Sequence, residues 1–167
     1  RSRGLGDVYK RQLFVRPVSN AAHGMNKLSL GLNSSYIYTN AKMPLATVTT
    51  GSQLEGAAPW IVNFDLSHNF TKGERSFVNT LVLNYVSDKI YTIGTQGYQD
   101  IMEQGVLTLD FVSQAKLNKH LSFNLKARNL LNPSYKLSRK ANENGEKVIL
   151  NDYKKGINIS LGVSCTF

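Results

Sequence analysis

The side chains that most often carry out catalysis form no recognisable constellation in this sequence. The histidines His23, His68 and His120 share no metal-ligand spacing. The single cysteine, Cys165, cannot close an internal disulfide and matches no metal or redox motif. The sequence also lacks a nucleophile elbow, a phosphate-binding loop and a zinc-binding pattern. We therefore expect a protein that is not an enzyme and that needs no metal ion or other cofactor.

The basic character of the chain comes partly from its first residues. The opening segment, 1–12, reads RSRGLGDVYKRQ and lacks periodicity; it resembles a translated sequencing-adapter remnant, and a disordered native tail is the alternative. We leave this segment out of the fold prediction. Because it holds four basic residues and one acidic residue, the net charge then falls from +9 to +6. The remaining basic residues are dispersed, with adjacent pairs only at 139–140 and 154–155, which favours a solvated surface over a nucleic-acid site.

Six segments of the chain alternate between apolar and polar residues. Successive side chains of a strand point to opposite faces, so this period of two predicts β-strands that each have one apolar and one polar face. The segments are 28–38, 60–70, 77–85, 107–117, 121–127 and 157–167. The stretch LFVRPV, 13–18, is a candidate for the tail of a seventh strand. No apolar run approaches the roughly 18 residues of a transmembrane helix.

The apolar face of these six strands holds no charged residue. The other face holds Asp65, Asp110, Lys116 and Lys126, and Arg128 comes directly after the segment 121–127. An Arg or Lys that faces lipid at mid-bilayer costs roughly 2–4 kcal/mol, so a lipid-facing surface excludes these residues. The core of a soluble β-sandwich excludes charge as well, so the alternation leaves both architectures open.

Loop lengths favour the membrane architecture. Short turns, TKGERS at 71–76 and NKH at 118–120, alternate with much longer loops, as in outer-membrane barrels with short periplasmic turns and long extracellular loops. In the last long loop Asn144-Gly145 suits a tight hairpin turn, so we expect a two-stranded flap above the membrane. Aromatic residues near the strand ends would form the interfacial girdles, namely Tyr36, Tyr38, Trp60, Phe70, Phe77, Tyr85 and Phe167. The predicted fold is therefore all-β, an antiparallel transmembrane β-barrel whose last strand ends at the periplasmic side and pairs with the first.

Residues 13–167 resemble the TonB-dependent outer-membrane receptors, in the form common in Bacteroidetes. Three segments carry the resemblance: LEGAAPWIVNFDLSHNF, KARNLLNPSYK, and the terminal phenylalanine with apolar residues at alternate positions before it. The second resembles the family's penultimate strand, which ends in N-L-L-N-P-x-Y and is broken here at Asn132-Pro133, because proline lacks an N–H. Cys165 is a mild departure, since a larger apolar or aromatic residue is more usual there.

The resemblance implies a barrel of about 22 strands around an N-terminal plug that follows a TonB box. Residues 13–167 would supply its last six or seven strands without the plug, so the chain would be a C-terminal fragment. The implied function is TonB-energised uptake of a scarce extracellular nutrient, such as a siderophore, cobalamin, a glycan or a peptide, across the bacterial outer membrane. The expected partners are outer-membrane lipid, the TonB complex, a small extracellular ligand and the barrel-assembly machinery, which would read Val163, Cys165 and Phe167; nucleic acid is not expected.

The resemblance also implies two sets of site residues. Aromatic and charged residues of extracellular loops are the usual readers of ligands, and the candidates are Tyr98, Gln99, Asp100, Arg139, Lys140 and Tyr153. Charged residues of the polar face would point into the lumen, where they pair with one another or line the solute path. These are Asp65, Asp110, Lys126 and Arg128.

Two alternatives belong to other classes. A small complete outer-membrane barrel, an adhesin or a passive channel, would need one or two more strands and a signal peptide directly upstream. A soluble β-sandwich that binds, for example, carbohydrate would be monomeric without detergent. The sequence does not identify the imported ligand, because importers of different ligands share this wall.

Overall fold

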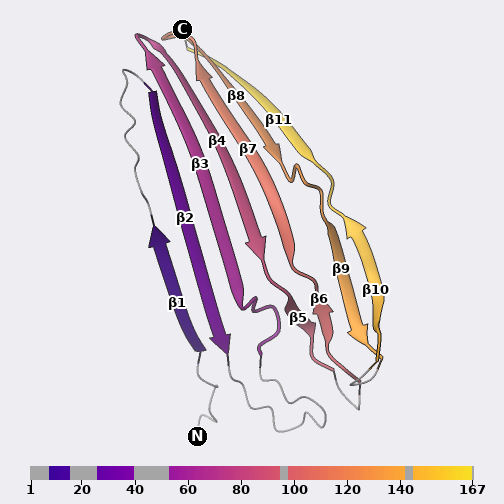
Figure 1. Cartoon of the computed structure of the whole chain (residues 1–167). Helices are drawn as coiled ribbons and strands as arrows, with labels where there is room; N and C mark the ends of the chain where they lie inside the picture. The colour runs from indigo at the N-terminus through magenta and orange to yellow at the C-terminus, as the bar shows by residue number, and fades with distance from the viewer. Residues whose placement is uncertain (1–7, 16–25, 40–52, 95–97, 142–144, 167) are drawn as a thin grey trace, which may run out of the picture.

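The computed structural model describes residues 8–15, 26–39, 53–94, 98–141 and 145–166. These ranges contain eleven strands and no helix, and the strands form two antiparallel sheets (Figure 1). The expectation of an all-β, antiparallel fold is confirmed at this level. No helix long and apolar enough to cross a bilayer occurs in the described ranges.

The larger sheet has seven strands, each paired with its neighbour along an up-and-down path. In spatial order they are β1 (Val8–Val15), β2 (Asn26–Thr39), β3 (Trp60–Lys72), β4 (Arg75–Val86), β7 (Val106–Lys116), β8 (Leu121–Arg128) and β11 (Asn158–Cys165). Six of them coincide with the six segments predicted from alternation. The seventh, β1, includes the start of LFVRPV, and it also begins inside the opening segment that was left out of the prediction.

The smaller sheet has four strands in the order β10, β9, β6, β5. Their bounds are β5 (Lys89–Thr92), β6 (Ile101–Glu103), β9 (Ser134–Lys140) and β10 (Lys147–Lys154). The predicted hairpin is present as β9–β10, but it is not a separate two-stranded flap, because β9 also pairs with β6. Asn144, at its expected tip, lies outside the described residues. The sequence analysis missed β5 and β6, because strands of four and three residues are too short to display a period.

The two sheets follow one another along the length of the molecule rather than stacking face to face (Figure 1). The β3–β4 and β7–β8 turns lie at one end, together with the end of β11, and the four-stranded sheet lies at the other. Gly73, with φ of 61°, allows the tight β3–β4 turn. The predicted separation of short turns from long loops is therefore present in the described chain.

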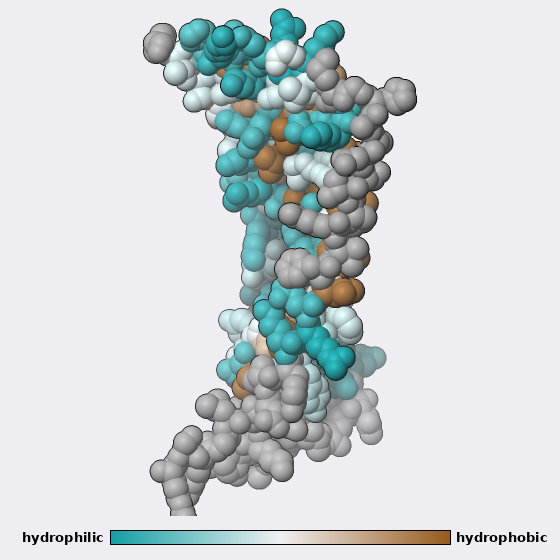
Figure 2. Space-filling view, turned by 90° about the vertical axis from the view of Figure 1, so that its left-hand side faces the viewer, coloured by the Kyte–Doolittle hydropathy of each residue, from teal (hydrophilic) through white to brown (hydrophobic). Residues whose placement is uncertain are grey.

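The strand register brings the predicted apolar positions together on one face of the seven-stranded sheet. One row across this face contains Leu30, Leu66, Leu81, Phe111, Ala127 and Ile159. Aromatic pairs flank the face at both ends: Tyr36 and Trp60 have ring centroids 4.7 Å apart, and Phe70 and Phe77 6.2 Å apart. Seen edge-on in Figure 2, hydrophilic residues follow one side of the sheet, and the hydrophobic residues that are visible lie toward the other.

The apolar face has no second layer of described residues over it. Ile159 and Leu161 of the edge strand β11 are 68% and 71% exposed. Among the described residues only four apolar side chains are buried, namely Ala58, Ile90, Ala127 and Tyr135. Two sheets that share a common sandwich core are therefore not the arrangement of the described chain.

Candidate ligand-binding face

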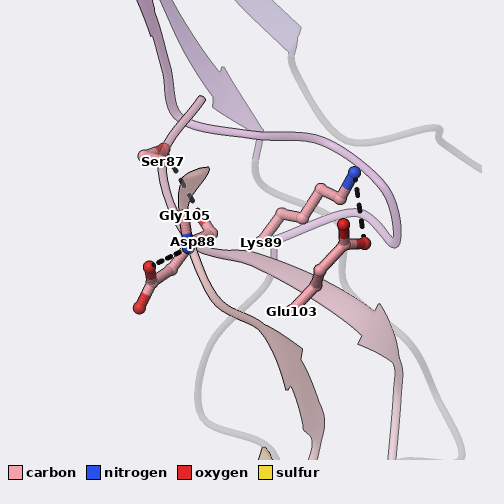
Figure 3. A network of polar contacts seen from close by, with 5 residues as sticks. All are labelled: Ser87, Asp88, Lys89, Glu103 and Gly105. Atoms are coloured by element: carbon pink, nitrogen blue, oxygen red, sulfur yellow. Dashed lines mark hydrogen bonds and ion pairs between the residues drawn. The ribbon is translucent and has the colours of Figure 1, made fainter. Parts of the chain in front are cut away.

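The four-stranded sheet is fixed to the larger sheet by a hydrogen-bonded junction where β4 passes into β5 and β6 into β7 (Figure 3). The Trp60 amide donates to the Ser87 hydroxyl at 3.0 Å, and the Ser87 amide donates to the Trp60 carbonyl at 3.0 Å. The Gly105 amide donates to the Asp88 carboxylate at 2.6 Å, which ties the two crossing segments together. A Cβ at Gly105 would lie 2.8 Å from the Val86 carbonyl oxygen, so glycine allows this close approach.

A second junction joins the β8–β9 and β10–β11 connections. The Asn129 side-chain amide donates to the Gly156 carbonyl at 2.7 Å, and the Gly156 amide donates to the Asn132 side-chain oxygen at 3.0 Å. Both asparagines have positive φ, 58° and 43°, a conformation that asparagine tolerates better than most residues. We call Asn129, Asn132 and Gly156 the asparagine clamp. As predicted, Pro133 lies in a strand break, between the end of β8 and the start of β9.

The four predicted lumen-facing residues share the polar face of the seven-stranded sheet by strand register. The Asp110 carboxylate accepts a hydrogen bond from the backbone amide of Asn129 at 2.8 Å, so Asp110 supports the asparagine clamp. The Asp65 carboxylate lies over Gly31, in the space that a Cβ would occupy. Within the described residues none of the four, Lys126 and Arg128 included, forms an ion pair with another of the set.

One face of the four-stranded sheet forms a groove of about 400 Å³. It is lined by Tyr91, Glu103, Tyr135, Leu137, Asn151 and Tyr153, and we call it the tyrosine groove. Strand pairing explains why these residues meet: Leu137 of β9 lies opposite both Glu103 of β6 and Asn151 of β10, and Tyr135 lies opposite Tyr153. With Tyr91 of β5, the groove is therefore a surface built from all four paired strands rather than a gap between loops.

Tyr135 is the buried centre of the groove, with only 8% of its surface exposed. On one side its ring stacks on Tyr153, with centroids 5.5 Å apart and planes 21° apart. The Lys155 ammonium lies 3.9 Å from its centroid, in cation–π contact. Glu103 is paired with Lys89 at 3.3 Å (Figure 3). The site thus combines exposed rings, one neutralised carboxylate and a cation held against an aromatic ring.

A second cavity, of about 270 Å³, connects this site to the larger sheet. It shares Glu103 and Tyr135 with the tyrosine groove and adds Lys89 and Lys155. Its other walls belong to the β4–β5 and β6–β7 junction and to the polar face of β4 and β7; they include Asn84, Val86, Ser87, Gln104, Val106 and Thr108. The polar face of the seven-stranded sheet therefore continues into the groove.

Comparison with known proteins finds no relative of this chain. No family model, curated protein or solved structure matches the chain.

The six predicted ligand contacts all belong to the four-stranded sheet or its connections, but only Tyr153 lines the groove. Tyr98 meets Arg139, whose guanidinium carbon lies 5.1 Å from its ring centroid. Asp100 instead accepts a hydrogen bond from the Gly94 amide at 2.8 Å and closes its own loop. Gln99 and Lys140 line neither cavity described here.

Sequence reasoning missed Tyr91, Glu103, Tyr135, Asn151 and Lys155. The chosen candidates were aromatic and charged residues of assumed loops, whereas these five lie in or beside short strands inside those loops. The alternation of Tyr135 and Leu137 in SYKLSRK was the available signal, because it predicts a strand with an aromatic face.

The end of the chain is described up to Thr166. Val163 and Cys165 are exposed on the apolar face of β11, opposite Phe123 and Leu121 of β8. The predicted assembly residue Phe167 lies outside the described residues. Across the described ranges no three His, Cys, Asp or Glu side chains gather as they would around a metal ion.

Proposed function

We propose that the chain is the C-terminal wall and loop region of a TonB-dependent outer-membrane receptor, which imports a scarce extracellular nutrient. The observation that carries this proposal is the division of the seven-stranded sheet into two continuous faces. Its apolar face holds no charged residue in β2, β7, β8 and β11, and in β3 and β4 it holds only Lys72 and Arg75, which adjoin the short turn; in β1, Arg11 lies on this face level with Tyr36, near the other end. The face stays uncovered by described residues, as a lipid-facing wall requires. The polar face of the sheet leads into the tyrosine groove, as a solute path requires.

The arrangement of the ends supports the same proposal. Short turns gather at one end, which would be periplasmic, and the four-stranded sheet with its groove extends beyond the other, which would be extracellular. β1 and β11 are the two edges of the larger sheet, and an unpaired edge is costly in lipid. In the proposed receptor, further strands pair with both edges and close the barrel. A soluble sandwich is disfavoured because it would have to cover the apolar face.

Cysteine labelling of the two faces tests the membrane part of the proposal. In a Cys165→Ser background, Leu83→Cys places a thiol on the apolar face and Asn84→Cys places one on the polar face, at adjacent positions of β4. The protein is expressed from its complete reading frame in a Gram-negative host. In outer-membrane fractions we expect a water-soluble maleimide to label position 84 and a lipid-soluble one to label position 83. Equal aqueous labelling of both, with the protein in the soluble fraction, would refute a lipid-facing wall.

The reading frame upstream of residue 13 tests the receptor part of the proposal. We expect several hundred codons of alternating strands that lead back to a plug and a TonB box. A signal peptide directly upstream would instead make the protein a small complete barrel, and energised import would have to be abandoned.

A further inference from the structure

Two exposed rings give the tyrosine groove its recognition surface. Tyr91 is 53% exposed and Tyr153 is 45% exposed, although both line the groove. Tyr153 is held in place by its stack on the buried Tyr135, so its outer face is presented without further ordering. A preorganised aromatic face suits a ligand that contains flat or ring-shaped apolar surface.

Polar groups beside these rings suit hydroxyl groups. The Glu103 carboxylate can accept several hydrogen bonds, and Lys89 occupies only part of this capacity at 3.3 Å. Asn151, which lines the groove opposite Leu137, offers both a donor and an acceptor. Rings together with neighbouring hydroxyl groups are the chemistry of a saccharide.

The charge of this face indicates the sign of the ligand. Glu103 is neutralised by Lys89. Lys155 lies over Tyr135, and Arg139 lies over Tyr98 and shares the face of Tyr135 and Leu137 by strand alternation. Neither Lys155 nor Arg139 forms an ion pair with another described residue. The face therefore carries two cations that no described carboxylate neutralises.

We propose that the tyrosine groove binds an acidic saccharide, a sugar chain that carries carboxylate or sulfate groups. In this arrangement Tyr91 and Tyr153 stack on sugar rings, and Glu103 and Asn151 bind hydroxyl groups. The acidic substituents reach beyond the groove, where they pair with Lys155 in the adjoining cavity and with Arg139 farther along β9. The inference rests on the proposed function, since it names the substrate class of the receptor's extracellular site.

Calorimetric titration of the detergent-purified protein, expressed from its complete reading frame, tests the inference. The probes are tetragalacturonate, its fully methyl-esterified neutral form, and tripolyphosphate as an anion without rings. We expect tetragalacturonate to bind at least about tenfold more tightly than either control, because it alone offers both rings and charge, and tenfold corresponds to 1.4 kcal/mol. Equal or tighter binding of the neutral ester, or of tripolyphosphate, would overturn the proposal.

Matched variants assign the binding to this groove. Lys155→Met should weaken tetragalacturonate binding about tenfold and leave the weak binding of the neutral ester unchanged, whereas Lys154→Met, one residue away and outside both cavities, should change neither by more than about twofold. Tyr153→Ala should weaken the binding of both tetragalacturonate and its methyl ester, and Tyr153→Phe should retain the binding of both because the ring remains. Equal effects of the two lysine variants would place the binding elsewhere and refute the proposal.

The labelling experiment keeps the two proposals separable. A protein that resides in the outer membrane but binds no tetragalacturonate would overturn the acidic-saccharide inference alone. A protein that labels as a soluble protein would overturn the receptor proposal, whatever the result of the titration.

Discussion

The Asn129 side-chain amide donates a hydrogen bond to the Gly156 carbonyl at 2.7 Å, across 27 positions of sequence. This contact joins the two places where the chain leaves and re-enters the seven-stranded sheet to form the β9–β10 hairpin. Asn132 completes the asparagine clamp from the other side of Gly156, and Asp110 holds the Asn129 backbone. The tyrosine groove is thereby fixed to the wall at one junction, and the Ser87–Gly105 region fixes it at the other.

Gly156→Ala should loosen the asparagine clamp. The φ of Gly156 is 81°, and a left-handed conformation costs a residue with a Cβ about 1–2 kcal/mol. We expect the free energy of unfolding, measured by urea titration in micelles, to fall by about this amount. Gly162→Ala in β11 is the matched control, because its Cβ would make an ordinary contact at 3.7 Å with Asn124. Comparable losses for the two variants would show that the conformation of Gly156 is not the cause.

Gly31→Ala should be destabilising because of Asp65, one of the four predicted lumen-facing residues. A Cβ at position 31 would collide with the Asp65 carboxylate, which would have to leave its present rotamer, and such a displacement costs about 0.5–1.5 kcal/mol. Asp65→Ala should remove the collision, so the double variant should be more stable than the sum of the single losses predicts. Strict additivity of the unfolding free energies would contradict the contact.

Leu81→Lys and Val82→Lys should differ sharply although the positions are adjacent in β4. Leu81 lies in the apolar row opposite Leu66 and Phe111, whereas Val82 lies on the polar face opposite Asp65 and Asp110. If the apolar face meets lipid, Lys at position 81 costs roughly 2–4 kcal/mol, and Lys at position 82 is tolerated between two carboxylates. The unfolding free energies in lipid vesicles measure this difference. A similar effect of both variants would argue against a lipid-facing wall.

Much of the larger sheet was predictable from the sequence, and much of the groove was not. The alternation in β2, β3 and β4 is long enough to define both the strands and their faces. The stack of Tyr135 on Tyr153 depends instead on the register of the β9–β10 hairpin, which shifts by one residue between Ile149 and Asn151. Without this β-bulge Tyr153 would lie on the face of the hairpin opposite to Tyr135, and no local sequence pattern predicts the shift.

The asparagine clamp also depends on contacts that local sequence patterns do not predict. Asn132-Pro133 predicts a strand break from local chemistry alone, and the break is present. Its partner Gly156 lies 24 positions from Asn132, at the other end of the hairpin. Only the pairing of β8 with β11 and of β9 with β10 brings the two connections together.

Two ion pairs, Lys89–Glu103 beside the tyrosine groove and Lys119–Glu74 between the short turns, should contribute unequally to stability. We expect the pair beside the groove to contribute more. Lys89 and Glu103 lie 3.3 Å apart, and their side chains are 27% and 20% exposed. Lys119 and Glu74, which link the two short turns, lie 3.0 Å apart, and their side chains are 74% and 55% exposed. Exposed pairs gain little because water and salt screen them, so we expect a coupling energy below about 0.5 kcal/mol for Lys119–Glu74. For Lys89–Glu103 we expect about 1 kcal/mol, since partial burial weakens this screening. Double-mutant cycles with Lys→Met and Glu→Gln at each pair, at low and at high salt, measure both values. A larger coupling for the turn pair would show that distance, rather than burial, decides the strength of these interactions.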